Sequence, residues 1–299
     1  MKVLVTNPRG FCAGVVRAID IVEIAIKKFG PPIYVKHQIV HNPEVVNDVE
    51  NQGAITVEKV EEIPEGSVVV FSAHGSAPED YNKAKERNLN VIDATCPLVT
   101  KVHNEAKKYN NEKKSIILVG HEGHQEVKGT MGQTEMILYD ERKEFPKDKL
   151  KNLKNVAVIS QTTLSVNDTA KAIKNIKEII PDATVRNDIC YATTNRQDAT
   201  ELLSDLCDLV LVIGANNSSN CQRLKDVARR KGVPSYLILG PQEINYNWLK
   251  NIETIGITSG ASTPEKMVQE VIKAIRPEKV EYIGGPPEDI TFKMPKELI

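Results

Sequence analysis

The chain has 299 residues, with 39 Lys and Arg against 40 Asp and Glu, a formal net charge of −1 and 5% aromatic residues. This balance argues against a general nucleic-acid binder, which needs a basic surface and stacking rings. No apolar run approaches the roughly 18–20 residues that span a bilayer, and the N-terminal segment MKVLVTNPRG lacks the features of a signal peptide. We therefore expect a cytoplasmic globular protein without a nucleic-acid or membrane partner.

Short runs with the pattern of β-strands alternate with helical patterns along the whole chain. Runs such as VAVIS and LVLVIG are almost entirely apolar, as in strands buried on both faces of a parallel sheet. Apolar residues at helical spacing predict helices at 15–29, 166–180 and 262–275. In chain order, the predicted strands are 3–6, 33–36, 54–57, 67–73, 91–94, 115–120, 135–139, 156–160, 183–186, 209–214, 235–240, 252–258 and 280–283.

Cysteine, histidine and hydroxyl side chains follow many of these strands, where a loop leads into the next helix. In chain order they form three sets of three, and the separation between the first two members is almost the same in each set. This pattern predicts a threefold internal repeat of roughly 90 residues. Ligands of open α/β sheets bind beyond the carboxyl ends of the strands, so we expect these side chains to face a ligand. The sets are Cys12, His41 and His74; Cys96, His124 and Thr162; and Cys190, Ser219 and Ser262.

The predicted fold class is α/β, with three pseudo-threefold-related lobes around a central cavity. Each lobe is expected to be a small, mainly parallel sheet with flanking helices. We place lobe 1 at residues 14–96, lobe 2 at 97–190, and lobe 3 at 191–284 together with the strand in 1–13. Residues 285–299 are expected to form a C-terminal tail.

The chain has five cysteines and no C-x-x-C segment, which argues against a disulfide framework or a zinc ribbon. Cys12, Cys96 and Cys190 each lie between a predicted strand and a helix. Three thiolates at a common centre suit an iron–sulfur cluster or zinc. A [4Fe–4S] cluster with three cysteine ligands would keep one iron open to a substrate. Cys207 and Cys221 are predicted to be structural.

Three histidines and two polar loops suggest an anion site. The loops NNSSN and SGASTPE supply hydroxyl, carboxamide and backbone N–H donors at helix starts, as phosphate-binding loops do. Ordinary helix capping is the alternative for these loops. Because no Lys or Arg lies in the loop cores, the pattern predicts a compact polyanion held by neutral donors and by His41, His74 and His124. The other histidines, His37 among them, are expected to be structural or at the surface.

Glu126 lies two residues after His124 in the segment GHQE. A buried carboxyl can act as a general acid when desolvation raises its pKa. Thr162 and Thr163, in the segment QTT, could relay or orient its proton. The alternatives are a solvated surface charge for Glu126 and helix capping for the threonines.

The segments that carry these residues together resemble the 4-hydroxy-3-methylbut-2-enyl diphosphate reductase family, also called LytB-type. They run from residue 8 to residue 265, so the resemblance covers nearly the whole chain. The matching segments are PRGFCAGVVRAI, HQIVHNPEVV, SAHGSAP, VIDATCPLV, GHEGHQEVKGTMGQ, QTTLS, DICYATTNRQ, SSNCQRL and SGASTPE.

The resemblance implies an iron–sulfur enzyme at the last step of the non-mevalonate isoprenoid pathway. Such an enzyme removes the hydroxyl of (E)-4-hydroxy-3-methylbut-2-enyl diphosphate by a two-electron reduction and forms isopentenyl or dimethylallyl diphosphate. The resemblance also implies a monomer and an electron-donor protein such as ferredoxin or flavodoxin. One [4Fe–4S] cluster per chain would be held by Cys12, Cys96 and Cys190, with one open iron.

The resemblance assigns roles to the remaining side chains as well. Glu126 would be the proton donor, and Thr162 or Thr163 would lie near the substrate hydroxyl. The residues expected around the diphosphate are His41, His74, His124, Ser218, Ser219, Asn220 and Ser262.

Three other functions fit the residues. A hydro-lyase would use a three-cysteine cluster purely as a Lewis acid and would turn over without a reductant. A redox-sensing protein would bind the phosphorylated ligand without converting it. A zinc hydrolase would hold zinc without acid-labile sulfide.

Overall fold

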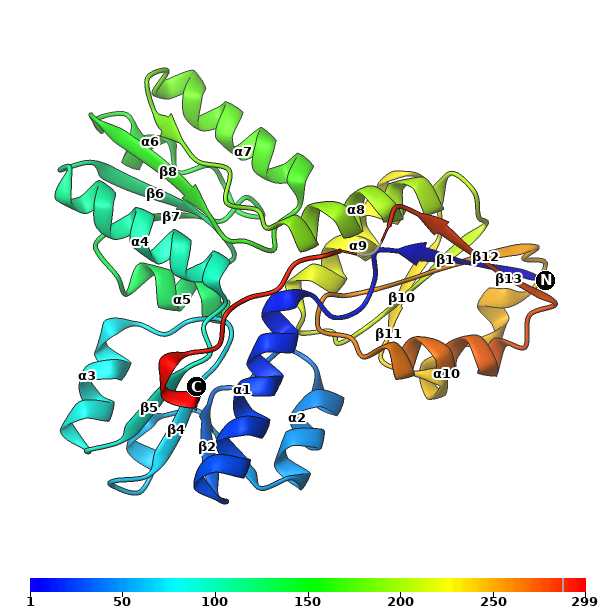
Figure 1. Ribbon diagram of the computed structural model, residues 1–299. Coiled ribbons are helices and arrows are strands. Elements are labelled where there is room, and N and C mark those ends of the chain that lie inside the picture. Colours follow the sequence, from blue (N-terminus) through cyan, green and yellow to red (C-terminus); the bar gives the residue numbers. More distant parts are fainter. Residues whose placement is uncertain (287) are drawn as a thin grey trace. The chain divides into compact units, whose positions relative to one another are not determined.

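The computed structural model describes residues 1–286 and 288–299. In this part of the chain the strands form three sheets, and every strand pair is parallel (Figure 1). The chain divides into two compact units, which we describe separately. Unit 1 comprises Met1–Val15, His41–Val45 and Tyr191–Thr291, and unit 2 comprises Val16–Val40, Val46–Cys190 and Phe292–Ile299.

The sheet of unit 1 has the strand order β11-β10-β12-β1-β13. Its N-terminal strand β1 lies between β12 and β13, so the first residues of the chain pair with its last two strands. The apolar runs of β1, β10 and β12 are buried along their length, as the sequence predicts for a sheet covered on both faces. The strand bounds are β1 Lys2–Asn7, β10 Leu209–Ile213, β11 Ser235–Ile238, β12 Thr254–Ser259 and β13 Lys279–Gly284.

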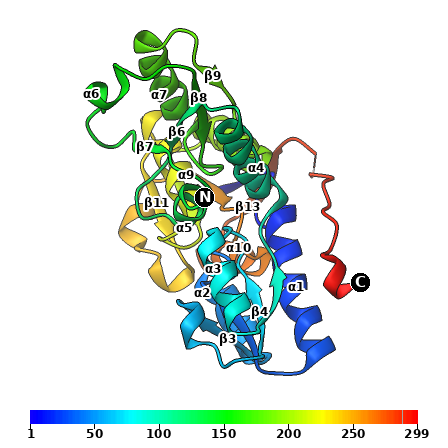
Figure 2. The same cartoon turned by 90° about the vertical axis from the view of Figure 1, so that its left-hand side faces the viewer.

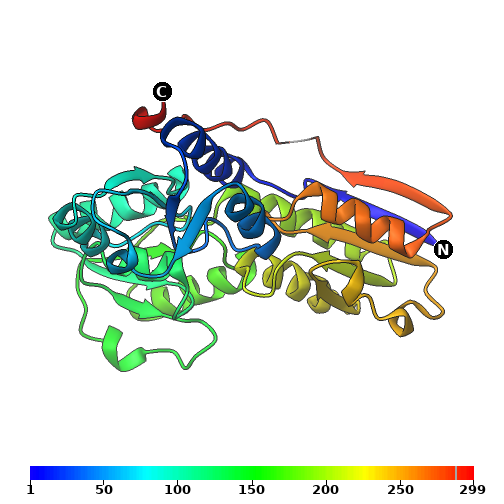
Figure 3. The same ribbon diagram turned by 90° about the horizontal axis from the view of Figure 1, so that it is seen from below.

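Helices cover both faces of this sheet (Figure 3). Successive strand residues point to opposite faces, and Val3 packs in a cluster with Val268 of α10, whereas Leu4 packs in a cluster with Leu224 of α9. Helix α8 lies on the same face as α9, through Leu203. The helix bounds are α8 Tyr191–Ser204, α9 Ser219–Arg230 and α10 Glu265–Ile275, with short 3₁₀ helices at Pro241–Glu243 and Tyr246–Leu249.

Unit 2 holds the two other sheets, with the strand orders β3-β2-β4-β5 and β7-β6-β8-β9 (Figure 2). The bounds in the first sheet are β2 Ile33–Lys36, β3 Ala54–Val57, β4 Val68–Phe71 and β5 Asn90–Asp93. Those in the second sheet are β6 Ser115–Val119, β7 Ile137–Tyr139, β8 Val156–Ser160 and β9 Thr184–Val185.

The helices of unit 2 also lie on opposite faces of the second sheet. Ile176 of α7 packs with Val158, whereas Val102 of α4 and Val127 of α5 pack with Ile159, the next residue of β8. Two further helices, α1 and α2, begin in unit 1 and continue in unit 2. The bounds are α1 Ala13–Phe29, α2 Pro43–Asn51, α3 Pro78–Glu86, α4 Pro97–Asn111, α5 Gln125–Met131, α6 Lys147–Leu150 and α7 Val166–Ile179, with 3₁₀ helices at Val60–Glu62 and Lys296–Leu298.

One strand order recurs in all three sheets. If the strands of each repeat are numbered along the chain, their order across the sheet is second, first, third, fourth. In unit 1 the first three are β10, β11 and β12, the N-terminal strand β1 takes the fourth position, and β13 pairs with β1 as an additional edge strand. A threefold internal repeat predicts such a shared order, although no clear sequence identity links the repeats. The predicted α/β architecture of three small parallel sheets with flanking helices is confirmed.

The predicted elements differ from the observed ones mainly at their ends. Strands β2, β3 and β8 have the predicted bounds. The strands predicted at 67–73 and 183–186 shorten to β4 and β9, because their outer residues already turn into the loops. The helix predicted at 262–275 begins at Glu265, since the preceding residues form a loop that ends at Pro264.

Candidate active site

Apart from the three cysteines, the candidate site residues follow two adjacent inner strands of each sheet. In the second sheet of unit 2, the chain leaves β6 for a helix on one face and β8 for a helix on the other. In unit 1 it leaves β10 and β12 in the same divergent way. Ligands of open α/β sheets bind where neighbouring connections diverge like this. The side chains in question are His124, Glu126, Thr162 and Thr163 after β6 and β8, and Ser218, Ser219, Asn220 and Ser262 after β10 and β12.

Glu126 is buried at the start of α5, with 3% of its surface exposed. The backbone N–H of Thr162 donates to Oε1 of Glu126 at 2.6 Å, and the hydroxyl of Thr162 donates to Oε2 at 3.0 Å. Both carboxyl oxygens are therefore held by Thr162, in the loop after β8. Thr163 accepts a hydrogen bond from the side chain of Gln161 at 2.9 Å.

Burial raises the pKa of Glu126 to about 7, since the charged form loses its hydration. The two hydrogen bonds from Thr162 act in the opposite direction, and the nearby charge of Asp188 adds to the increase. A carboxyl whose pKa lies near neutral pH is suited to general acid catalysis. The alternative of a solvated surface charge for Glu126 is therefore wrong, because the side chain is buried.

Asp188 is a second buried carboxyl in this sheet, with 5% of its surface exposed. Burial raises its pKa above the ordinary range. Its Oδ2 accepts from the backbone N–H of Ser160 at 3.3 Å, and Lys101 lies 3.8 Å from its Oδ1. Sequence analysis gave Asp188 no role, although it lies two residues before Cys190 in one of the matching segments.

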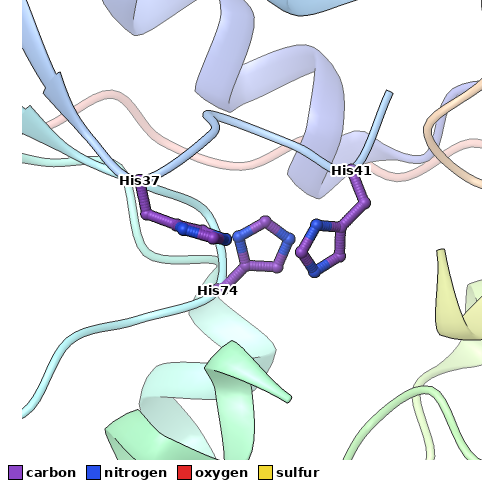
Figure 4. A group of neighbouring side chains, drawn as sticks. All are labelled: His37, His41 and His74. Carbon is purple, nitrogen blue, oxygen red and sulfur yellow. The ribbon is translucent and has the colours of Figure 1, made fainter. Parts of the chain in front are cut away.

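The histidines of unit 2 lie close together. His124 caps α5, and its Nδ1 accepts from the backbone N–H of Glu126 at 3.2 Å. This bond assigns the ring proton to Nε2 in the neutral imidazole, so Nε2 can donate to an anion. The His74 ring lies 5.6 Å from the ring of His37, and both side chains are drawn in Figure 4. The His74 ring also lies 6.3 Å from the ring of His124, and its Nδ1 lies 3.3 Å from the hydroxyl of Ser72.

His41, the third side chain drawn in Figure 4, belongs to unit 1 and is described with it. The hydroxyl of Ser262 donates to the backbone oxygen of His41 at 3.1 Å. Asn42, which is fully buried, donates from its side chain to the backbone oxygen of Ser262 at 2.8 Å. The segment that carries His41 is therefore bonded to the loop after β12. No role was expected for Asn42, and the one indication of it in the sequence is that it directly follows His41.

The two polar loops of unit 1 are joined through Asn220, which is 4% exposed. Its side-chain oxygen accepts from the backbone N–H of Ala261 at 3.1 Å, which connects the loop after β10 to the loop after β12. Ser218 caps α9, with its hydroxyl accepting from the backbone N–H of Cys221 at 3.4 Å. Helix capping thus accounts for Ser218, while Ser219 and Asn220 form the first turn of the helix. These neutral donors suit an anion.

Cys12, Cys96 and Cys190 follow the fourth strand of their respective sheets, and each directly precedes a helix. Their backbone N–H groups make equivalent hydrogen bonds to the loop after the third strand. Cys12 donates to Ala261 at 3.1 Å, Cys96 to Ala73 at 3.0 Å and Cys190 to Thr162 at 3.0 Å. Each cysteine is therefore bonded to a candidate substrate residue or to the residue before one, within a single sheet.

These three cysteines differ from the other two in their surroundings. All five are thiols. Cys221 is fully buried, whereas Cys207 and the three cysteines at helix starts are partly exposed. Burial raises the pKa of Cys221, and it raises that of Cys207 to about 11, which disfavours a thiolate at either. Helix N-termini favour thiolates. The guanidinium of Arg17 adds positive charge near Cys96. Thiols at helix starts suit metal ligation, whereas Cys221 lies in the core of unit 1 and Cys207 packs against it.

The remaining histidines have local partners. His37 lies 2.9 Å from Glu58, and His121 lies 2.7 Å from Glu141. Burial lowers the pKa of His103 to about 4, which keeps its ring neutral. These contacts agree with the structural or surface roles expected for them. None of the helices in residues 1–286 and 288–299 combines the length and hydropathy needed to cross a bilayer.

Comparison with known proteins identifies relatives along the whole chain. A relative named 4-hydroxy-3-methylbut-2-enyl diphosphate reductase, from Ectopseudomonas mendocina (strain ymp), is 46% identical over 100% of this chain and 98% of its own. One named 4-hydroxy-3-methylbut-2-enyl diphosphate reductase 2, from Bradyrhizobium diazoefficiens, is 50% identical over 100% of this chain and 99% of its own.

Solved structures give the same result. The E-1-hydroxy-2-methyl-but-2-enyl-4-diphosphate reductase of Plasmodium falciparum has a TM-score of 0.93 and 37% identity, over 99% of this chain and 96% of its own. A structure described as (E)-4-hydroxy-3-methyl-but-2-enyl diphosphate reductase, the terminal enzyme of the non-mevalonate pathway, has a TM-score of 0.66 and 31% identity, over 92% of this chain and 99% of its own. A family model described as LytB protein matches residues 3–276, and the chain belongs to this family.

Proposed function

We propose that this protein is a 4-hydroxy-3-methylbut-2-enyl diphosphate reductase. The reaction removes the allylic hydroxyl as water, consumes two electrons and two protons, and forms isopentenyl or dimethylallyl diphosphate. The observation that carries the proposal is the buried carboxyl of Glu126, whose pKa is raised to about 7, at the start of the helix that His124 caps. Relatives that match this chain over 98% and 99% of their own length are named as this reductase.

The family uses an iron–sulfur cluster. We propose one [4Fe–4S] cluster per chain, with Cys12, Cys96 and Cys190 as ligands and one iron open. When bound, the cluster supplies the electrons for the reduction and a Lewis-acidic iron for the substrate hydroxyl. The equivalent strand-end positions of the three thiols and their place at helix N-termini support this assignment.

The diphosphate is bound by neutral side chains in this proposal. The Nε2–H of His124, the hydroxyl of Ser219 and the carboxamide of Asn220 donate to its oxygens, and the N-terminus of α9 adds a favourable dipole. Neutral donors hold the anion without a strong charge pair, so the diphosphate product can also leave. The full proposed set is His41, His74, His124, Ser218, Ser219, Asn220 and Ser262.

Glu126 is the proposed proton donor. Hydroxide is a poor leaving group, so a carboxylic acid near the allylic oxygen lowers the barrier by delivering a proton as the C–O bond breaks. Thr162 holds both oxygens of Glu126 and so sets the direction of its proton. Thr163 is proposed to orient the substrate hydroxyl.

The wider organisation is proposed on the same basis. Lobes at 14–96, at 97–190, and at 191–284 with 1–13 form the repeat, and 285–299 form the tail. The protein acts as a cytoplasmic monomer that receives electrons from a ferredoxin or a flavodoxin.

The function is tested with protein purified without air. We expect a brown protein whose absorption bleaches with dithionite, with iron and sulfide in cluster stoichiometry, and turnover of the allylic diphosphate that depends on reductant. Cys96→Ser should lose most of the cluster, and the matched control Cys221→Ser should keep it. Turnover without reductant would indicate a hydro-lyase, and substrate binding without turnover would indicate a sensor. Zinc without acid-labile sulfide would indicate a hydrolase. Each of these outcomes would refute the proposal.

A further inference from the structure

The C-terminal tail contains a buried ion pair that the proposed chemistry does not use. Arg196 of α8 is fully buried, and its guanidinium bonds both carboxylate oxygens of Glu288, at 3.0 to 3.1 Å. Asn195 donates a further hydrogen bond to Glu288 at 3.0 Å. A buried guanidinium needs a compensating charge, and the tail supplies it. All of these residues belong to unit 1.

Arg196 also bonds the loop that carries Cys12. Its Nε and one terminal nitrogen donate to the backbone oxygen of Gly10, at 3.3 and 2.8 Å. Gly10 has a φ of +67°, a conformation that glycine adopts readily, and its N–H donates to the hydroxyl of Ser259 at 2.9 Å. The guanidinium plane thus joins the tail carboxylate to a carbonyl two residues before Cys12.

The loop is held on its other side as well. The backbone N–H of Cys12 donates to Ala261, and that of Ala13 donates to the hydroxyl of Tyr191 at 3.2 Å. With Arg196 on the Gly10 carbonyl, the short segment around Cys12 is bonded at Gly10, Cys12 and Ala13. Arg196 thus bonds the backbone two residues before Cys12, and Glu288 is the anion that pairs with it.

A second buried arginine has an equivalent arrangement in unit 2. Arg17 of α1 donates to the backbone oxygen of Thr95 at 3.1 Å, directly before Cys96. It also donates to the backbone oxygen of Lys293 in the tail at 2.8 Å. The tail therefore contacts, within each unit, the arginine that bonds the loop before a candidate ligand cysteine.

We propose that the C-terminal tail positions the cysteine loops, with Glu288 acting through Arg196 on the Cys12 loop and the Lys293 carbonyl acting through Arg17 on the Cys96 loop. This inference rests on the proposed function, because it concerns Cys12 and Cys96 as cluster ligands. Glu288, Arg196 and Arg17 are positioning residues, since none of them is a proposed ligand. Partners that orient metal ligands commonly contribute 10- to 100-fold to metal affinity.

The test compares Glu288→Gln and Glu288→Asp with the control Asp289→Asn in the full chain. Asp289 is the exposed neighbouring carboxylate, so its change removes the same charge without removing the partner of Arg196. In the anaerobic cluster-loaded protein, we expect Glu288→Gln to lose iron to a chelator about 10- to 100-fold faster than the parent and to show an altered electron paramagnetic resonance signal. Glu288→Asp should recover part of the loss, and Asp289→Asn should match the parent.

Hydrogen exchange separates this inference from the proposed function. Backbone amides at 8–14 should exchange faster in Glu288→Gln whether or not the cluster is present, while amides in α10 should be unchanged. Arg17→Lys, which keeps the charge but loses the forked donor, should speed exchange at 94–99. A parent protein without a cluster would refute the proposed function. Unchanged exchange at 8–14 in Glu288→Gln would refute the positioning role, whichever form is measured.

Discussion

The loops after β6 and β8 in unit 2 and those after β10 and β12 in unit 1 have the same topology and different chemistry. Each pair follows two adjacent inner strands of a parallel sheet, and the connections that leave these strands diverge. In unit 2 the loops bury an acid, Glu126, against Thr162. In unit 1 they carry hydroxyl and carboxamide groups around Asn220 and Ser262, joined by a hydrogen bond to Ala261.

In the proposed reaction, this difference separates two tasks. A proton donor must change its charge during turnover, so it benefits from burial that brings its pKa near neutral pH. An anion site keeps its charge, so neutral donors and a helix N-terminus suffice. One repeated fold can thus carry both a buried acid and a set of neutral anion donors, because the repeats share their strand order and differ in the side chains that follow the strands.

The largest effect is expected for removal of the acid. Glu126→Gln keeps the shape of the side chain but cannot deliver a proton, so turnover should fall by about 10²- to 10⁴-fold. Substrate affinity and iron content should stay near those of the parent, because Glu126 is neither a proposed ligand nor part of the anion loops. Steady-state turnover with an artificial reductant, together with iron analysis, measures this. Near-normal turnover with a full cluster would mean that the proton comes from another group.

A smaller effect is expected for a change in the anion loops. Asn220→Asp keeps the oxygen that accepts from Ala261 but replaces a donor by a negative charge. Loss of one hydrogen bond to a charged group costs about 1.5–3 kcal/mol, so substrate affinity should fall by roughly 10- to 150-fold or more. The exposed Asn216→Asp in the same loop is the control. Equal losses in both variants would indicate a general charge effect.

Most of the strands, and the strand-end positions of the candidate residues, could be predicted from the sequence. Apolar runs such as β8 have a strong strand pattern, and polar residues directly after them must lie at the carboxyl edge of a sheet. The burial of Glu126 could not be decided in this way, because a glutamate after a histidine has the same local sequence whether it is solvated or enclosed. Its partner Thr162 is distant in sequence.

The two buried arginines illustrate the same limit. Arg17 and Arg196 lie in segments that resemble the family. In the sequence pattern, however, neither differs from an ordinary polar residue on the exposed face of a helix. Both bond backbone oxygens in distant segments, and Arg196 also bonds the carboxylate of Glu288 in the tail. A contact with a backbone carbonyl leaves no signature in the partner's residue type, so sequence patterns alone do not reveal it.

The pH dependence of turnover should report the acid directly. Burial raises the pKa of Glu126 to about 7, so the protonated donor is present below that value and lost above it. Turnover should therefore be level on the acid side and fall about tenfold per pH unit above the pKa. The free energy of unfolding should also decrease with rising pH. Because the pKa of Glu126 is higher in the folded state than its unfolded value of 4.5, its contribution to stability is complete below 4.5 and is lost as the pH rises through about 7. A Glu126→Gln profile that kept the alkaline limb would assign it to another group.

The smallest effect, and the sharpest test of the comparison, concerns the hydroxyl of Thr162. It donates to Glu126 at 3.0 Å and favours the charged carboxylate, so it lowers the pKa against the larger effect of burial. Thr162→Val removes this hydroxyl and keeps the backbone N–H that donates to Oε1. Loss of a hydrogen bond worth about 1.5–3 kcal/mol to the charged form should raise the pKa by roughly one to two units.

The alkaline limb of the Thr162→Val profile should therefore move to higher pH, and the variant should retain more of its maximal turnover than the parent at alkaline pH. Thr162→Ser keeps the donor and should keep the parent's limb. A direct role of the hydroxyl in binding the substrate would instead lower turnover at every pH without moving the limb. An unmoved limb in Thr162→Val, or an equal shift in Thr162→Ser, would therefore show that the pKa of Glu126 is set by burial without the help of this hydroxyl.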